Sequence, residues 1–213
     1  IETKLRRLRY ILSSWQLDPV FPHHEGYNPF NRVLEHTDFS REPTKEPPRL
    51  PVETLRSILG GISQLRDRVV IGTQLKLGLR ASELANLQLR DVALTDPQLH
   101  QAYPSLGTHH ALGGHEDAVY IASRYEREQN KSHRPRVLPL DEELQGLLTQ
   151  YLIIRPDTGS DRVLLTKSTH NPVDQEYINR RWTSVFHPAY AETDTHSAVT
   201  SHFGRHRFTT HWR

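Results

Sequence analysis

Hydrophobic and polar positions alternate along most of the chain with the spacing of amphipathic helices. Apolar residues three or four positions apart predict helices over residues 1–17, 52–62, 67–77, 141–154 and 174–186, and a last helix from about Ser201 to the end. Gly78 is expected to break the helix before it. Ser82 is expected to cap a further helix, with Leu84, Leu87 and Leu89 as its buried side.

Strand patterns occur at two places. Residues 118–122 and 136–140 predict the two strands of a hairpin, joined by a polar, arginine-rich connector over 123–135. Residues 163–165 are expected to form a short buried segment. Residues 93–117 lack periodicity, which indicates a long surface loop or insertion. The predicted fold class is mostly α with a small antiparallel β-sheet (α+β).

Proline divides the chain. From Pro19 to about Pro51 prolines are frequent and helical periodicity is weak, which predicts a linker. The basic helix before it is therefore expected to be the end of a preceding module. The remaining residues are expected to form one domain.

Composition narrows the class of protein. The 213 residues hold 27 Lys and Arg against 25 Asp and Glu, a net charge of +2, and arginine outnumbers lysine. Charge-driven disorder is not expected at this balance. The absence of cysteine excludes disulfides and cysteine metal sites. No apolar run is long enough for a membrane span, and a cytoplasmic protein without membrane contact is expected.

Three basic clusters hold candidate chemistry. Arg80 stands just ahead of a predicted helix N-terminus, where free amides favour an anion, and Glu83 is spaced to hold its guanidinium. Lys131 lies in the basic hairpin connector, and His202 and Arg205 share one face of the last helix. Each cluster alone also fits a bland interpretation as a surface ion pair or a solvated run of charges.

The order of these clusters resembles the tyrosine recombinase (phage integrase) family. The family's Gly-Leu-Arg-x-x-Glu-Leu box is similar to Gly78-Leu-Arg80-Ala-Ser-Glu83-Leu84. Its hairpin lysine with an apolar-Pro-Leu ending is similar to residues 131–140, and its His-x-x-Arg box to residues 202–211. The resemblance implies the end of a core-binding DNA-binding domain at 1–35, a linker at 36–50 and a recombinase catalytic domain at 51–213.

The resemblance also implies residue roles. Arg80 and Arg205 would hold the scissile phosphate, Lys131 would protonate the 5′-oxygen, His202 would donate to the phosphate, and Glu83 would orient the arginine. Further DNA contacts are expected from five arginines: Arg6, Arg7, Arg134, Arg136 and Arg207. No metal and no other cofactor is implied. The implied partners are double-stranded DNA and, in the full-length protein, a homotetramer on two recombination sites.

The sequence also departs from the family pattern. The family's nucleophilic tyrosine follows the His-x-x-Arg box, whereas all eight tyrosines here precede His202. The chain is therefore expected to be a fragment that ends before the nucleophile and does not cleave DNA by itself. Leu77 stands where the family usually has Thr, and Gly204 where it usually has Leu.

Three alternatives stay open. The first is a non-catalytic DNA-binding relative or regulator that keeps the phosphate-binding residues. The second is a type IB topoisomerase, which shares the phosphate chemistry. The third is a metal-dependent nuclease that would use His109, His110 and His115.

Overall fold

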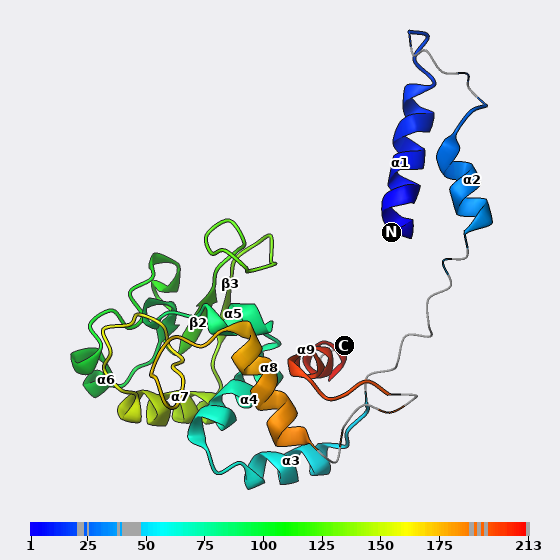
Figure 1. Ribbon diagram of the computed structural model, residues 1–213. Helices are drawn as coiled ribbons and strands as arrows, with labels where there is room; N and C mark the ends of the chain where they lie inside the picture. The colour runs from blue at the N-terminus through cyan, green and yellow to red at the C-terminus, as the bar shows by residue number, and fades with distance from the viewer. Residues whose placement is uncertain are drawn as a thin grey trace. The chain divides into compact units, whose positions relative to one another are not determined.

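The computed structural model of the chain describes residues 1–20, 24, 26–37, 39, 48–187, 190, 193 and 196–211 (Figure 1). The chain forms two compact units, Ile1–Thr44 and Lys45–Arg213. Most of the predicted linker, residues 38 and 40–47, lies outside the described residues.

The first unit is a pair of helices, α1 (Glu2–Trp15) and α2 (Pro29–His36). The first matches the helix predicted over 1–17. The second was missed, and the prediction of a linker is wrong over its eight residues. Asn28 explains the helix, because its side-chain oxygen accepts the Phe30 N–H at 3.1 Å and Pro29 needs no donor at the first helical position. The Asn28 amide also donates to the Arg9 carbonyl at 3.1 Å, which fastens α2 to α1.

The second unit contains the helices that the periodicity predicts. They are α3 (Val52–Gly61), α4 (Leu65–Leu77), α5 (Ala81–Ala85), α7 (Glu142–Ile154), α8 (Gln175–Phe186) and α9 (Ser201–His211). The prediction that Ser82 caps α5 is wrong. Arg80 occupies the cap position, and the Glu83 carboxylate accepts the Arg80 N–H at 2.9 Å. None of the described helices is long and apolar enough to cross a membrane.

The sheet has three antiparallel strands in the order β1 (Val92–Ala93), β2 (Ala118–Ile121) and β3 (Arg136–Pro139). The predicted hairpin is β2–β3, with Val119 opposite Leu138. The two residues of β1 were missed, because two residues are too few to show a period. The expectation of an irregular loop over 93–117 is wrong at α6 (Pro97–Ala102) and at the 3₁₀ turn His110–Leu112.

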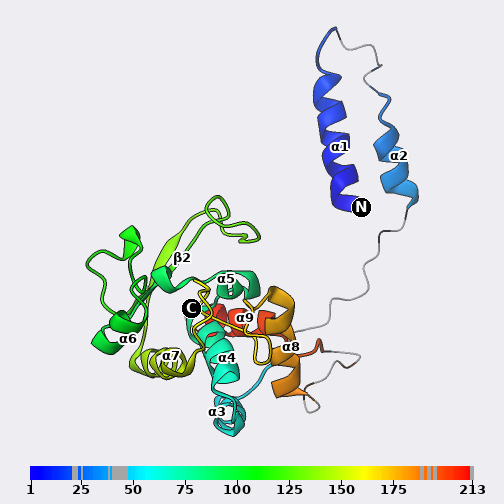
Figure 2. The same ribbon diagram turned by 60° about the vertical axis from the view of Figure 1, so that its left-hand side comes forward.

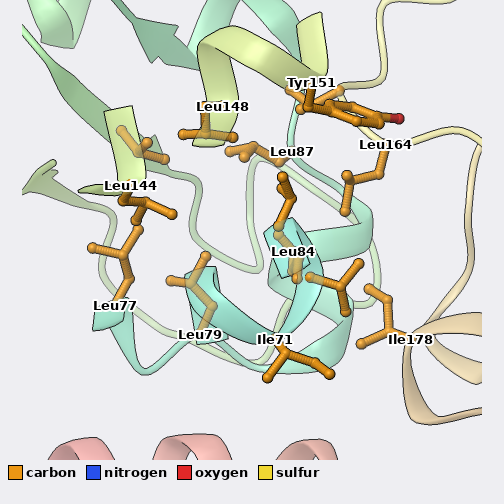
Figure 3. Close-up of a cluster of buried hydrophobic side chains, with 14 of the residues drawn as sticks. Ile71, Leu77, Leu79, Leu84, Leu87, Leu144, Leu148, Tyr151, Leu164 and Ile178 are labelled. Atoms are coloured by element: carbon orange, nitrogen blue, oxygen red, sulfur yellow. The ribbon is translucent and has the colours of Figure 1, made fainter. Parts of the chain in front are cut away.

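Helix α4 is the centre of the second unit. It packs against α5, α7, α8 and α9, and eight of its thirteen residues are buried (Figures 1 and 2). Leucines from α5, α7 and the turns around them point toward Ile71 and Leu77 of this helix (Figure 3). Val163, Leu164 and Leu165 are buried as predicted. The fold is mostly α with a small antiparallel sheet, and the turn after α4 is held by packing from several sides.

Candidate functional site

The turn between α4 and α5 brings two of the predicted arginines together. Gly78 ends α4 with φ +61°, and a Cβ on this residue would lie 2.5 Å from a ring carbon of Phe208 in α9. Only glycine meets both conditions, the left-handed backbone and the close approach of α9. The Gly78 carbonyl accepts Nη1 of Arg205 at 2.8 Å. Arg80 follows two residues later, so one turn positions both guanidiniums.

Glu83 is the buried centre of this arrangement. Its side chain has no exposed surface, and its carboxylate accepts Nη1 of Arg80 at 3.1 Å and Nη2 of Arg136 at 2.8 Å. Burial alone would raise the pKa of the Glu83 carboxyl, but hydrogen bonds from Arg136 and from the Arg80 backbone, with the charge of both guanidiniums, hold that pKa below its ordinary value. Glu83 is therefore ionised at neutral pH and holds Arg80 from within the fold.

Helix α9 reaches the same turn because Gly204 lets it pack closely. A Cβ at Gly204 would lie 2.9 Å from Cζ2 of Trp182, whose side chain is fully buried in α8. The Trp182 indole donates to the Gln74 side chain at 2.5 Å, and the Gln74 amide donates to the Leu79 carbonyl at 3.0 Å. The departure from leucine at position 204 thus has a packing reason, which places the first turns of α9 against α4.

The positive charges of other side chains act on both His202 and Arg205. Burial lowers the pKa of the His202 imidazole, and the neighbouring charges of His206, Arg205, Arg80 and Lys131 lower it further. Burial and then Arg80 likewise lower the pKa of the Arg205 guanidinium, and Glu83 opposes them. Cations that disfavour one another's charged forms in this way favour an anion between them.

Lys131 stands at the edge of this cluster. It is exposed on the connector between β2 and β3, and no described residue forms an ion pair or hydrogen bond with its ammonium group. Its charge acts on His202 and helps to lower the pKa of that imidazole. The structure therefore brings Arg80, Glu83 and Arg205 to one turn, and the charges of Arg205, Arg80 and Lys131 act on His202.

The other predicted DNA contacts lie in different surroundings. Arg136 forms an ion pair with Glu83. Arg134 is exposed on the connector, whereas Arg207 is half-buried and donates to the Leu50 carbonyl at 3.1 Å. In the first unit Arg6 pairs with Glu2 at 2.7 Å and Arg7 is exposed. A DNA contact by any of these arginines stays a prediction.

The connector is held by residues that the sequence did not single out. Asn86, at the end of α5, donates to Asn130, and Arg127 pairs with the fully buried Asp91 at 2.6 Å. Their only signal in the sequence is an amide and an arginine among many polar residues. Long-range pairing of this kind cannot be read from local spacing.

Three tyrosines of the second unit form hydrogen bonds with groups outside the cluster. The Tyr120 hydroxyl donates to Glu126, Tyr103 donates to the Leu152 carbonyl at 2.9 Å, and the Tyr151 hydroxyl accepts the Leu165 N–H at 3.1 Å. Among the described residues no tyrosine has a hydrogen bond to Arg80, His202 or Arg205.

The histidine-rich segment gives no metal site. His109 stacks on Tyr120 with ring centroids 3.8 Å apart, and its Nδ1 accepts the Ala111 N–H at 3.2 Å. Within the part of the chain that the structure describes, no group of three or more His, Asp or Glu side chains could hold a metal ion. The nuclease alternative built on His109, His110 and His115 is not supported by this geometry.

Comparison with known proteins agrees with the arrangement. The profile of the phage integrase family matches residues 49–212. No curated protein sequence matches the chain at comparable strength. Three similar solved structures are the XerA recombinase (20% identity, TM-score 0.57, 86% of this chain and 57% of that one), the Tn1549 transposon integrase in complex with transposon right-end DNA (17%, 0.62, 98% and 65%) and a lambda integrase tetramer bound to a Holliday junction (12%, 0.58, 98% and 52%).

The chain spans between half and two thirds of the length of these three structures, and the likeness to them extends over both its helices and its sheet. The match of the family profile covers more than half of the chain and includes every box that the sequence shares with the family. The chain therefore belongs to the phage integrase family, whose members are tyrosine recombinases.

Proposed function

We propose that this chain supplies the phosphate-binding and proton-transfer groups of a site-specific DNA recombinase. In this proposal Arg80 and Arg205 bind the non-bridging oxygens of the scissile phosphate. The observation that carries the proposal is the convergence of both guanidiniums on one turn, with the buried Glu83 carboxylate behind Arg80 and the Gly78 carbonyl on Arg205. His202 donates a hydrogen bond to the same phosphate.

Fixed guanidiniums suit this chemistry. Attack on a phosphodiester adds negative charge to the phosphoryl oxygens in the transition state, and donors already held in place stabilise that charge without reorganising. The mutual repulsion between Arg80 and Arg205 in the free protein is relieved when the phosphate binds. The site requires no metal for this step, because the arginines provide the positive charge.

Lys131 acts on the leaving group. Strand cleavage breaks the bond between phosphorus and the 5′-oxygen, and the lysine ammonium donates a proton to that oxygen as it leaves. The nucleophile is a tyrosine hydroxyl, which forms a 3′-phosphotyrosyl link. The tyrosines of the 213 residues have other positions, so the proposal has this hydroxyl supplied from outside them.

The proposed partner is double-stranded DNA, and the proposed assembly is a homotetramer on two recombination sites. The DNA complex of the Tn1549 integrase and the tetramer of lambda integrase on a Holliday junction support both parts by analogy. The first unit, through residue 35, is proposed as the end of a DNA-binding core-binding domain. Arg6 and Arg7 are proposed to contact the DNA backbone from its first helix. Arg134 and Arg207 are proposed to do so from the second unit.

The rejoining half of the reaction tests the proposal on the chain itself. The substrate is a nicked duplex whose 3′ end at the nick carries a p-nitrophenyl phosphate. This aryl phosphate takes the place of the phosphotyrosyl link of the intermediate. The 5′-hydroxyl across the nick attacks phosphorus, the aryl–oxygen bond to phosphorus breaks, p-nitrophenolate leaves, and the hydroxyl proton passes to the Lys131 amine. A pool of duplexes with randomised flanks supplies the unknown DNA sequence, and joined strands are recovered by electrophoresis.

The chain should join strands in this assay with release of p-nitrophenolate. Arg80→Ala and Arg205→Ala should lower the joining rate by about 10²-fold or more, because each removes a donor to the transition-state charge. Arg180→Ala is the matched control, since Arg180 is an exposed helix arginine whose ion pair is with Glu176, one turn earlier in the same helix, at 2.5 Å. Joining that survives both Arg80→Ala and Arg205→Ala at the control rate would refute the site assignment.

A non-catalytic DNA-binding relative is the second candidate, favoured by the position of the tyrosines. It predicts that the chain binds duplex DNA but joins no strand in the same assay. Binding by either candidate should weaken steeply with salt, because bound DNA releases condensed counterions. The joining reaction therefore separates the two candidates where binding does not.

A further inference from the structure

The hairpin connector is fastened just before Lys131. Asn130 is buried, and its amide donates to the Ala122 carbonyl at 2.9 Å across the base of the connector. The side chain of Asn86, at the C-terminal end of α5, donates to the Asn130 side-chain oxygen at 3.0 Å and to the Glu128 carbonyl at 2.9 Å. These bonds tie the residue that precedes Lys131 to α5.

Arg127 adds a second attachment to the same region. Its side chain is 9% exposed and pairs through both terminal nitrogens with Asp91, at 2.6 and 2.9 Å. It also donates to the Asn86 carbonyl and, at 2.7 Å, to the Gln88 side chain. One planar guanidinium thus donates to four acceptor atoms of residues 86–91. These bonds restrict the movement of the connector relative to that segment.

The residues after Lys131 are tied to the middle of the same helix, at Glu83. Arg136, five positions later, donates to Glu83 through both terminal nitrogens and to Ser132 at 3.3 Å. Glu83 also holds Arg80. Helix α5 therefore connects to the connector on both sides of Lys131, and it carries the arginine that defines the phosphate position.

We propose that Asn86 and Arg127 are positioning residues that hold the Lys131 amine at the leaving-group oxygen. The inference rests on the proposed function, because it assigns the two side chains a role in that reaction. The exposed Lys131 side chain has no described hydrogen-bond or ion-pair partner of its own, so its location depends on the backbone that carries it. Proton transfer needs the amine within hydrogen-bond reach of the oxygen.

The joining reaction gives a readout that a purely structural role does not move. With a 5′-hydroxyl strand, the attacking oxygen must lose its proton, and Lys131 receives it. With a 5′-amino strand, the neutral nitrogen attacks through its lone pair, the aryl–oxygen bond to phosphorus breaks as before, and the surplus proton passes afterwards to buffer. Joining of the amino strand therefore depends far less on a general base than joining of the hydroxyl strand. Both reactions need the phosphate-binding arginines to the same extent.

Asn86→Ala and Arg127→Ala should each slow joining of the hydroxyl strand by about tenfold to 10²-fold, and Lys131→Ala should slow it at least as much. All three deficits should shrink to within a few fold on the amino strand. Arg80→Ala should be impaired on both strands. Arg90→Ala should be normal on both, because its side chain is 54% exposed and approaches Asp91 only to 4.0 Å.

Two outcomes would overturn the inference. Equal deficits of Asn86→Ala and Arg127→Ala on both strands would make them structural residues, and normal joining of the hydroxyl strand would give them no role. If the unaltered chain joins neither strand, the proposed function fails, and hydrogen exchange of the amides over residues 123–135 still tests the attachment. Exchange there should quicken in Asn86→Ala and Arg127→Ala relative to Arg90→Ala, and unchanged exchange would remove the inference's structural basis.

Discussion

Replacing Gly204 by alanine separates helix propensity from packing. In a helix interior the substitution normally stabilises a protein by about 1 kcal/mol, because alanine loses less backbone entropy on folding. At Gly204, however, the new methyl group would meet Trp182 Cζ2 at 2.9 Å, Trp182 Cη2 at 3.1 Å and Gln74 Cβ at 3.3 Å. The two effects have opposite signs, so their sizes decide the result.

Packing should prevail. The indole would have to move by about half an ångström to regain ordinary contact. Trp182 has no free space for that shift, since its side chain is fully buried and its N–H is bonded to Gln74 at 2.5 Å. Overpacking costs about 1–3 kcal/mol, and disturbing a buried hydrogen bond adds about 1 kcal/mol. After the gain of about 1 kcal/mol in helix propensity is subtracted, Gly204→Ala should destabilise the second unit by about 1–3 kcal/mol.

Thermal unfolding with Gly146→Ala as the matched control measures this difference. Gly146 lies inside α7, and a Cβ there would meet no atom within 4 Å. Gly146→Ala should raise Tm by about 2–4 °C, whereas Gly204→Ala should lower it by about 2–12 °C, for a unit of this size. Gly204→Ala should also slow strand joining, because α9 carries His202 and Arg205.

A Gly204→Ala protein as stable as Gly146→Ala would contradict the reasoning. It would mean that α9 does not press against Trp182 and that glycine does not set the position of His202 and Arg205. Loss of joining without loss of stability would place the effect in the site and not in the packing. A denaturant titration with an unchanged m-value would show that both variants unfold from a native state of equal compactness.

Three further outcomes follow from the same site. Gly78→Ala should destabilise the second unit by more than about 1 kcal/mol, since it strains a left-handed residue and meets Phe208 at 2.5 Å; equal Tm values would contradict this. Glu83→Gln should lower the free energy of unfolding of the second unit by about 2–3 kcal/mol at neutral pH, because it removes the negative charge that pairs with two arginines. Because the folded pKa of Glu83 is depressed, its contribution is present above the ordinary value of 4.5 and lost as pH falls below it; urea titrations should therefore show the deficit of Glu83→Gln narrowing in acid. The His202 imidazole, whose pKa is below the ordinary 6.5, should oppose folding as pH falls below that value, and its NMR titration should shift to higher pH when nicked DNA binds.

The regular part of the fold follows from local rules. Long amphipathic stretches such as Glu142–Ile154 predict their helices within one or two residues, because burial of one face repeats every few positions. Helix α2 was missed although its eight residues are amphipathic, because it is short, buries no side chain and lies in a proline-rich stretch that favours a linker. Its signal was chemical, an Asn28–Pro29 pair at a helix start.

The candidate site divides along a similar line. Arg80 and Arg205 were singled out because the order of their boxes resembles the phage integrase family, whereas the spacing within each box also fits ordinary surface pairs. Arg136 shows the limit. Its place in a basic run suggests contact with DNA, but its guanidinium lies 2.8 Å from a carboxylate 53 positions earlier in the chain. Pairing over that separation depends on the β2–β3 register, which local sequence does not encode.

The balance of charges in this site holds the arginines in place and still leaves a net positive charge. One buried carboxylate, Glu83, faces the guanidiniums of Arg80 and Arg136, with Arg205 close enough to feel all three charges. Full neutralisation would have held the arginines more firmly but left no attraction for an anion. A single carboxylate is enough to fix the position of Arg80 and too little to cancel the local charge. In the proposed function, the surplus positive charge, concentrated beside the first turns of α9, is what would attract the phosphate.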